Sequence, residues 1–189
     1  LKVSSYGSYY YAGQQLDFEP YLQTALALGT KDIRIWSQKV DREKQIGLVN
    51  EERLSLVMAD IKQAALLAQP HEISLHIEFH QGTYTDSTES AIRLIEEIDE
   101  PNVFLYWQPL AYLSAYEHLE QIERLGNRIS HVHVFHWDEN NNRHPLKDGH
   151  HRWINFVEKI ETKSRRSRYY LMEFVKDNTI EQLMEDVDT

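Results

Sequence analysis

Four short apolar stretches of the chain each end in a residue that can bind a metal ion or move a proton. These residues are Glu78, Gln108, His133 and Glu173, and they follow one another at intervals of roughly 25 to 40 positions, about the length of one strand–helix unit. Side chains at the carboxyl ends of successive barrel strands converge on one point, where barrel enzymes place their chemistry. The spacing therefore predicts a single site built from carboxylate, amide and imidazole groups.

The stretch that carries Glu78 has a polar face. Within residues 73–80, apolar side chains alternate with Ser74, His76, Glu78 and His80. Because successive side chains of a strand point to opposite faces, these polar residues share a face. The same alternation groups Arg34 with Trp36, Phe104 with Tyr106 and Gln108, and His131 with His133 and Phe135. We expect these faces to line the inside of a barrel.

Strands and helices alternate along the chain. The expected strands are residues 1–10, 32–36, 73–80, 103–107, 130–136 and 169–175, and the expected helices are residues 17–28, 51–68, 86–97, 114–125, 153–159 and 179–187. Asp86 is expected to cap the third helix, with Glu89 as its capping-box partner. A polar loop is expected at 138–149. This alternation is typical of a parallel sheet with right-handed crossovers.

A barrel fits this order better than a doubly wound sheet. The doubly wound nucleotide-binding fold needs a G-x-G-x-x-G turn after its first strand, and residues 6–13 do not supply one. A complete (β/α)8 TIM barrel has eight strands and about 250 residues. We therefore expect residues 1–189 to form a single α/β domain, a partial TIM barrel of about six units without the first two. The first strand should lie beside residues 32–36, and residues 169–175 should form the last strand.

Composition narrows the classes of function. A formal net charge of −10 argues against binding to a nucleic-acid backbone. The chain has no cysteine, no apolar stretch of about 20 residues and no signal-peptide pattern, so we expect a cytoplasmic protein without a membrane partner. An open barrel exposes two sheet edges. The chain is then either a fragment of a larger folded protein or a homo-oligomer that associates through those edges.

Several segments carry a resemblance to a known family. They are IRIWSQ (33–38), IEFHQGTYTDSTESAIRLIEE (77–97), YWQP (106–109), HVHVFHW (131–137), RHPL (143–146) and LMEF (171–174). With them, nearly the whole chain resembles the bacterial sugar phosphate isomerase/epimerase family of xylose-isomerase-like TIM barrels. That resemblance implies a Glu, Asp, His, Glu ligand set around one divalent cation. Glu78, His133 and Glu173 match the set, and Gln108 stands where the family usually has Asp.

The Gln108 departure has consequences for the cation. With two carboxylates, the ligand set balances a 2+ charge with none to spare, and an amide oxygen binds a hard cation more weakly than a carboxylate does. Mn²⁺, Mg²⁺ or Zn²⁺ are all candidates. The alternative is a decayed, metal-free site in a non-catalytic sugar-binding barrel. A bound cation would distinguish the two.

The chemistry implied by the resemblance is aldose–ketose isomerisation or ketose epimerisation on a sugar or sugar phosphate. Glu78 and Glu173 would remove and return the proton next to the carbonyl through an enediolate. The implied substrate-binding residues are Arg34, Trp36, His80, His131 and Trp137. For Arg34 an ion pair inside the barrel is the competing interpretation, and for the two tryptophans it is a cover over the barrel mouth.

An apurinic-site endonuclease of the same superfamily is a further alternative. That enzyme needs a larger His/Asp/Glu set, with an Asp at the position of Gln108 and a His three residues later. Here that later residue is Ala111, and the surface is acidic.

Overall fold

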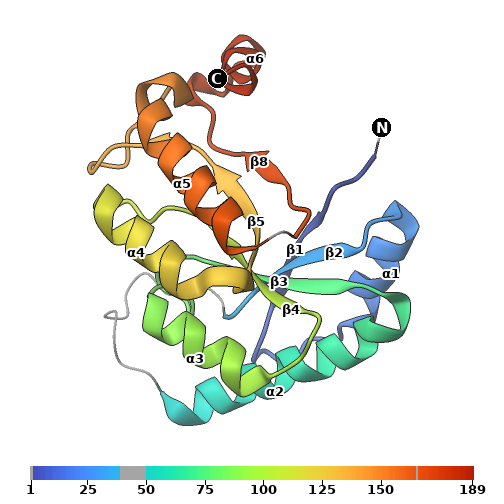
Figure 1. The fold of residues 1–189 in the computed structure, drawn as a ribbon. Helices are drawn as coiled ribbons and strands as arrows, with labels where there is room; N and C mark the ends of the chain where they lie inside the picture. Colours follow the sequence, from blue (N-terminus) through green and yellow to red (C-terminus); the bar gives the residue numbers. More distant parts are fainter. Residues whose placement is uncertain (1, 39–49, 165) are drawn as a thin grey trace. The chain divides into compact units, whose positions relative to one another are not determined.

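A computed structural model describes residues 2–38, 50–164 and 166–189. The chain forms two compact units, Leu1–Tyr106 and Trp107–Thr189, and each consists of strands that alternate with helices (Figure 1). Leu1, the first residue of the expected first strand, lies outside the described residues.

The first unit is built on parallel strands in the order of the sequence. These strands are β1 (Tyr6–Tyr11), β2 (Asp32–Trp36), β3 (Ser74–Glu78) and β4 (Val103–Trp107), the last residue of which belongs to the second unit. Its helices are α1 (Glu19–Leu28), α2 (Glu51–Ala68) and α3 (Thr88–Ile98). The pairing of β1 with β2 confirms the predicted place of the first strand. The strand itself begins later than expected, at Tyr6.

The register of the first unit confirms the predicted faces of its strands. Arg34 lies opposite His76, and His76 lies opposite Phe104, so these side chains form one row across the sheet. Glu78 lies opposite Tyr106 in the next row on the same face. Residues of the other face, Ile33, Leu75 and Ile77 among them, are fully buried. His76 and Glu78 are buried as well.

The helices of the first unit follow their capping signals, with one correction. Asn50 accepts a hydrogen bond from the Arg53 N–H at the start of α2 (3.0 Å). The prediction that Asp86 caps the third helix with Glu89 is wrong. Ser87 has extended backbone and accepts from the Ser90 N–H (3.2 Å), and the Ser90 hydroxyl accepts from the Ser87 N–H in return. The capping box therefore lies one residue further along the chain.

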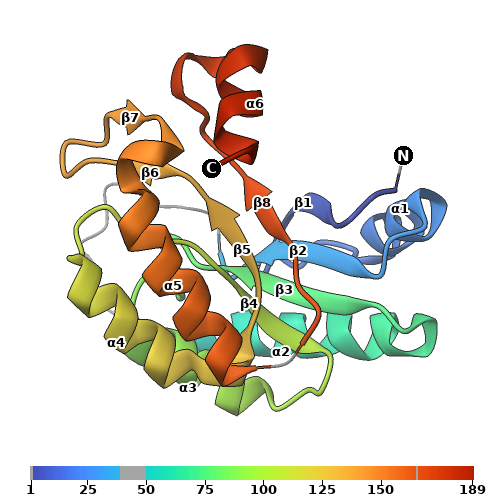
Figure 2. The ribbon, with the colours of Figure 1, turned by 45° about the horizontal axis from the view of Figure 1, so that its top comes forward.

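The second unit pairs two parallel strands and carries a small hairpin. β5 (Ile129–Val134) pairs with β8 (Tyr170–Met172), and β6 (His136–Trp137) pairs antiparallel with β7 (Arg143–His144). The helices are α4 (Ala115–Leu125), α5 (His150–Lys163) and α6 (Ile180–Val187), and α4 lies alongside α5 (Figure 2). The expected strand 130–136 is divided between β5 and β6, and the expected polar loop contains β7. The last strand is shorter than expected.

Aromatic rings fill the core of the second unit between α4 and α5. Trp107 contacts Trp153 and Phe156 edge-on, with ring centroids 6.3 and 5.5 Å apart. His118 of α4 packs on Trp107 and Phe156 as well, at 6.0 and 5.4 Å. Ser114 and Glu117 form a capping box that fixes the start of α4. The residue just before Gln108 is therefore held in a rigid core.

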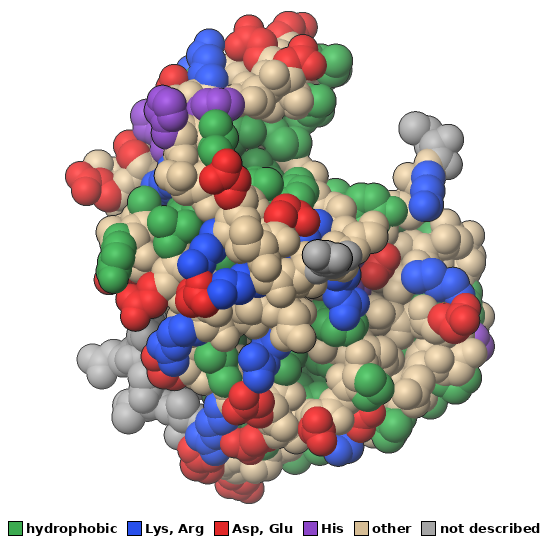
Figure 3. All heavy atoms as spheres, in the orientation of Figure 1, with side chains coloured by type: hydrophobic (Ala, Val, Ile, Leu, Met, Phe, Trp, Pro, Cys, Tyr) green, Lys and Arg blue, Asp and Glu red, His purple; other side chains and the backbone are tan. Residues whose placement is uncertain are grey.

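On the face drawn in Figure 3, acidic and basic side chains are interspersed with apolar ones. In the part of the chain that the structure describes, no helix combines the length and the hydropathy needed to cross a lipid bilayer.

Candidate functional site

Three of the four predicted ligands meet in the second unit. Gln108 directly follows β4, His133 lies near the end of β5, and Glu173 directly follows β8. His133 Nδ1 lies 2.8 Å from Gln108 Oε1 and 3.2 Å from Glu173 Oε2. An amide oxygen can only accept a hydrogen bond, so in the bond to Gln108 Oε1 it is His133 Nδ1 that carries the proton. The two oxygens therefore lie close to the same nitrogen.

The donor set of these three residues fits a divalent cation. Ligand atoms at right angles around an ion, each about 2.1 Å from it, lie about 3.0 Å apart, and the two observed spacings bracket that value. Imidazole nitrogen with carboxylate and amide oxygens suits Mg²⁺, Mn²⁺ and Zn²⁺. A cation would take the place of the His133 Nδ1 proton, so binding should release that proton.

Backbone contacts hold the ends of these strands in place. The Glu173 N–H donates to the Val134 carbonyl (3.0 Å), which keeps Glu173 beside the end of β5. The next residue, Phe174, has a φ of 51°, a left-handed conformation that is strained for a bulky side chain. Its ring packs on Trp137 and Phe135, with centroids 4.7 and 5.4 Å apart. The chain therefore leaves β8 through a bend at Phe174, directly after Glu173.

Glu78, the fourth predicted ligand, lies in the first unit at the end of β3. It forms an ion pair with Arg34 of β2. Its carbonyl accepts from the Thr85 hydroxyl (2.5 Å), and the Phe79 N–H donates to the Tyr106 carbonyl (2.9 Å). Burial raises the pKa of the Glu78 carboxyl, and the Arg34 guanidinium opposes that rise. A buried carboxyl with a raised pKa is suited to proton transfer near neutral pH.

Arg34, Trp36 and His80 gather around this ion pair. The Arg34 guanidinium lies over the rings of Trp36 (5.0 Å) and Tyr9 (5.5 Å), and the Trp36 and His80 rings are 5.0 Å apart. The ion pair inside the barrel, the competing interpretation for Arg34, is the arrangement that the structure contains. The Trp36 Nε1–H is buried and has no acceptor among the described residues.

His131 and Trp137 lie in the second unit. His131 is 4% exposed, and its Nδ1 accepts a hydrogen bond from the Tyr169 N–H (3.0 Å). Trp137 belongs to an aromatic cluster with Phe135 and Phe174. Both residues have structural contacts, and their substrate-binding roles stay predictions.

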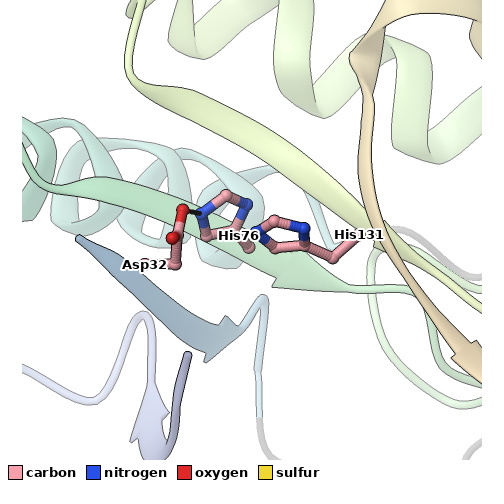
Figure 4. Close-up of side chains that lie close together, drawn as sticks. All are labelled: Asp32, His76 and His131. Atoms are coloured by element: carbon pink, nitrogen blue, oxygen red, sulfur yellow. Dashed lines mark hydrogen bonds and ion pairs between the residues drawn. The ribbon is translucent and has the colours of Figure 1, made fainter. Parts of the chain in front are cut away.

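One pair of polar side chains was not singled out from the sequence. Asp32, the first residue of β2, lies with its Oδ1 2.9 Å from Nε2 of His76, which is 1% exposed (Figure 4). The signal was available in principle, because alternation places His76 on the inner face of its strand. Nothing in the sequence shows that the Asp32 carboxylate turns toward it.

Solved structures show the same fold at low sequence identity. The probable 3-DHS dehydratase AsbF from Bacillus anthracis matches with a TM-score of 0.74 and 17% identity, over 100% of this chain and 76% of that one. A xylose isomerase-like TIM barrel protein from Mycobacterium smegmatis, in complex with magnesium, matches with a TM-score of 0.72 and 15% identity, over 100% of this chain and 71% of that one. The 3-keto-D-glucoside 4-epimerase YcjR from E. coli matches with a TM-score of 0.71 and 14% identity, over 100% of this chain and 77% of that one. A comparison with curated protein sequences gives no match.

The family model described as xylose isomerase-like TIM barrel matches residues 15–186. The fold is therefore an α/β TIM barrel of that type, of which the described residues contain six parallel strands. Over this match, the chain belongs to the xylose isomerase-like TIM barrel family.

Proposed function

We propose that the chain belongs to a divalent-metal-dependent isomerase or epimerase that acts on a sugar or sugar phosphate. The observation that carries the proposal is the meeting of Gln108 Oε1, His133 Nδ1 and Glu173 Oε2 after three strands of the barrel. Oxygen and nitrogen donors at the carboxyl ends of barrel strands are the usual setting for this chemistry. The epimerase YcjR and the magnesium-bound relative, which share the fold, make the proposal consistent with the family.

Gln108, His133 and Glu173 of the second unit would hold the cation, and the expected role of Glu78 as a fourth ligand stays a prediction. A bound divalent cation supplies electrostatic stabilisation of negative charge on the substrate's oxygens. One of the two carboxylates removes the proton from the carbon next to the carbonyl, and the electron pair of that C–H bond moves toward the carbonyl oxygen to give an enediolate. In epimerisation the other carboxylate returns a proton to the opposite face of the same carbon. In isomerisation it returns the proton to the former carbonyl carbon, while the hydroxyl proton of the first carbon passes to the former carbonyl oxygen. We assign these two roles to Glu78 and Glu173.

The ring surface around Arg34 would bind the body of the substrate. Trp36 offers a buried indole N–H without an acceptor among the described residues, and it lies beside the half-buried His80. The aromatic face suits the apolar C–H face of a sugar, and the indole N–H can donate to one of its hydroxyls. Arg34 already neutralises Glu78, so less of the Arg34 positive charge is available to a substrate.

Exchange of substrate protons with deuterium tests the reaction whatever sugar it produces. The full chain is loaded with Mn²⁺ or Mg²⁺ and incubated in D₂O with a panel of ketoses, aldoses and their phosphates, and NMR detects deuterium next to the carbonyl. Glu173→Gln and Glu78→Gln should each lower the exchange rate by about a hundredfold or more. Glu97→Gln, at an exposed position on α3, is the matched control.

The alternatives give different results in the same experiment. A sugar-binding barrel without catalysis would bind a sugar, measured by calorimetry, without cation and without exchange. An apurinic-site endonuclease would cleave DNA at abasic sites and leave the sugars unchanged. Either outcome would overturn the proposal.

A further inference from the structure

Two buried polar side chains of α4 contact the segment that carries Gln108. The Trp107 indole Nε1–H donates to Gln121 Oε1 (2.8 Å), and the Leu110 backbone N–H donates to His118 Nε2 (3.0 Å). His118 is 0% exposed and Gln121 is 3% exposed. The two bonds therefore hold the residue before Gln108 and the second residue after it.

Little freedom remains between these two anchored residues. Pro109 fixes its own φ and restricts the backbone conformation of Gln108 before it. Gln108 itself is 6% exposed. Its side-chain amide is therefore directed mainly by where α4 holds Trp107 and Leu110.

The helix that makes these contacts is itself fixed. The Ser114 and Glu117 capping box sets the first turn of α4, and the His118 ring is packed edge-on against Trp107 and Phe156. Apolar residues could fill the same space, but they would leave the Trp107 and Leu110 N–H groups without these acceptors. The polar identity of both residues therefore calls for a purpose beyond filling space.

An amide is a weak cation ligand, and this gives the polar contacts of His118 and Gln121 a purpose. A carboxylate is drawn toward a cation by its charge, whereas a neutral amide gains less and depends more on being in position beforehand. We infer that His118 and Gln121 are positioning residues, which hold the Gln108 amide oxygen beside His133 Nδ1. This inference rests on the proposed function for the role of Gln108 as a cation ligand.

Cation affinity is the first measurement. Mn²⁺ is titrated into the full chain by calorimetry for the wild type, His118→Phe and Gln121→Met, which keep the side-chain volume approximately and remove the acceptor. We expect each variant to weaken Mn²⁺ binding by about tenfold, the effect typical of residues that orient metal ligands. Ser114→Ala is the matched control, because it weakens the same helix and leaves both bonds in place. His118→Gln, which returns an acceptor oxygen, should recover part of the loss.

The tautomer of His133 is the second measurement, and it needs no cation. Long-range proton–nitrogen NMR of the imidazoles identifies the protonated nitrogen, with His133 assigned from a His133→Gln variant. In the wild type Nδ1 should carry the proton, because Gln108 Oε1 accepts from it. His118→Phe and Gln121→Met should shift His133 toward a mixture of tautomers, and Ser114→Ala should not.

The outcomes separate this inference from the proposed function. If the wild type binds no Mn²⁺, the proposed function loses its cation, and the tautomer still decides whether the two residues position Gln108. If both variants match Ser114→Ala in Mn²⁺ affinity and in the His133 tautomer, the two residues are structural only and the inference is overturned.

Discussion

His118 should make the stability of the protein depend on pH between about 4 and 6.5. Its Nε2 accepts the Leu110 N–H and must therefore be unprotonated. Burial, followed by the nearby Arg152, lowers the pKa of His118 to about 4, against about 6.5 for an unfolded chain. Between these values the unfolded chain binds more protons than the folded one, so the free energy of unfolding falls as pH falls. At about 1.4 kcal/mol per pKa unit, the loss is of the order of 3 kcal/mol.

Urea unfolding measures this loss when the wild type is compared with His118→Phe. Phenylalanine keeps a ring between Trp107 and Phe156 and cannot titrate. Near pH 7.5 the variant should be less stable by about 1–3 kcal/mol, because the Leu110 N–H loses its acceptor. Near pH 4.5 the difference in stability should vanish or reverse, because only the wild type has a buried imidazole that takes up a proton on unfolding.

The control for this experiment removes packing and leaves titration unchanged. Leu94→Ala removes a fully buried side chain from α3 of the first unit and should be destabilised by the same amount at every pH. If the difference between the wild type and His118→Phe is also constant from pH 7.5 to 4.5, the buried neutral imidazole is the wrong description of this residue.

Three further changes test the two units separately. Gln108→Asp should raise the affinity for Mn²⁺ by roughly tenfold or more, because a carboxylate replaces an amide; unchanged or weaker binding in the titration would show that Gln108 serves another purpose. Arg34→Met should cost about 3 kcal/mol at pH 7, since it leaves the Glu78 carboxylate buried without its counter-charge. The cost should shrink toward pH 4 as Glu78 becomes protonated, and a pH-independent loss in urea unfolding would contradict the ion pair. Ser87→Ala should cost about 1 kcal/mol in the same assay, whereas a larger cost for Asp86→Ala would restore the cap expected from the sequence.

The sequence was most informative where a pattern repeats over many residues. The strands at 32–36 and 103–107 and the helix at 51–68 were predicted with their observed ends. Each has strong internal periodicity or a clear stop signal, such as the proline after α2. The inner faces of the first unit followed from alternation alone, because the side-chain period of a strand leaves only two choices.

The sequence was least informative where the local signal is only one or two residues long. The two-residue strands β6 and β7 are too short to show alternation, so the hairpin was expected as a loop. The cap of α3 was misplaced because Asp86, Ser87 and the following residues are all plausible caps, and the backbone conformation of Ser87 decides among them. Arg34 pairs with Glu78 and His76 with Asp32, and each pair is 44 positions apart in the sequence, too far for a local pattern to show.

Phe174 has a consequence for anyone who redesigns this chain for thermal stability. A standard step is to place glycine wherever a residue adopts a left-handed backbone, which removes strain of the order of 1 kcal/mol. At Asp177 and Asn178 this step gains little, because these residue types tolerate the conformation. At Phe174 it would remove the ring that packs on Trp137 and Phe135 and would loosen the backbone directly after Glu173. At this position the residue that relieves the backbone strain, glycine, lacks the aromatic ring that the packing beside Glu173 needs.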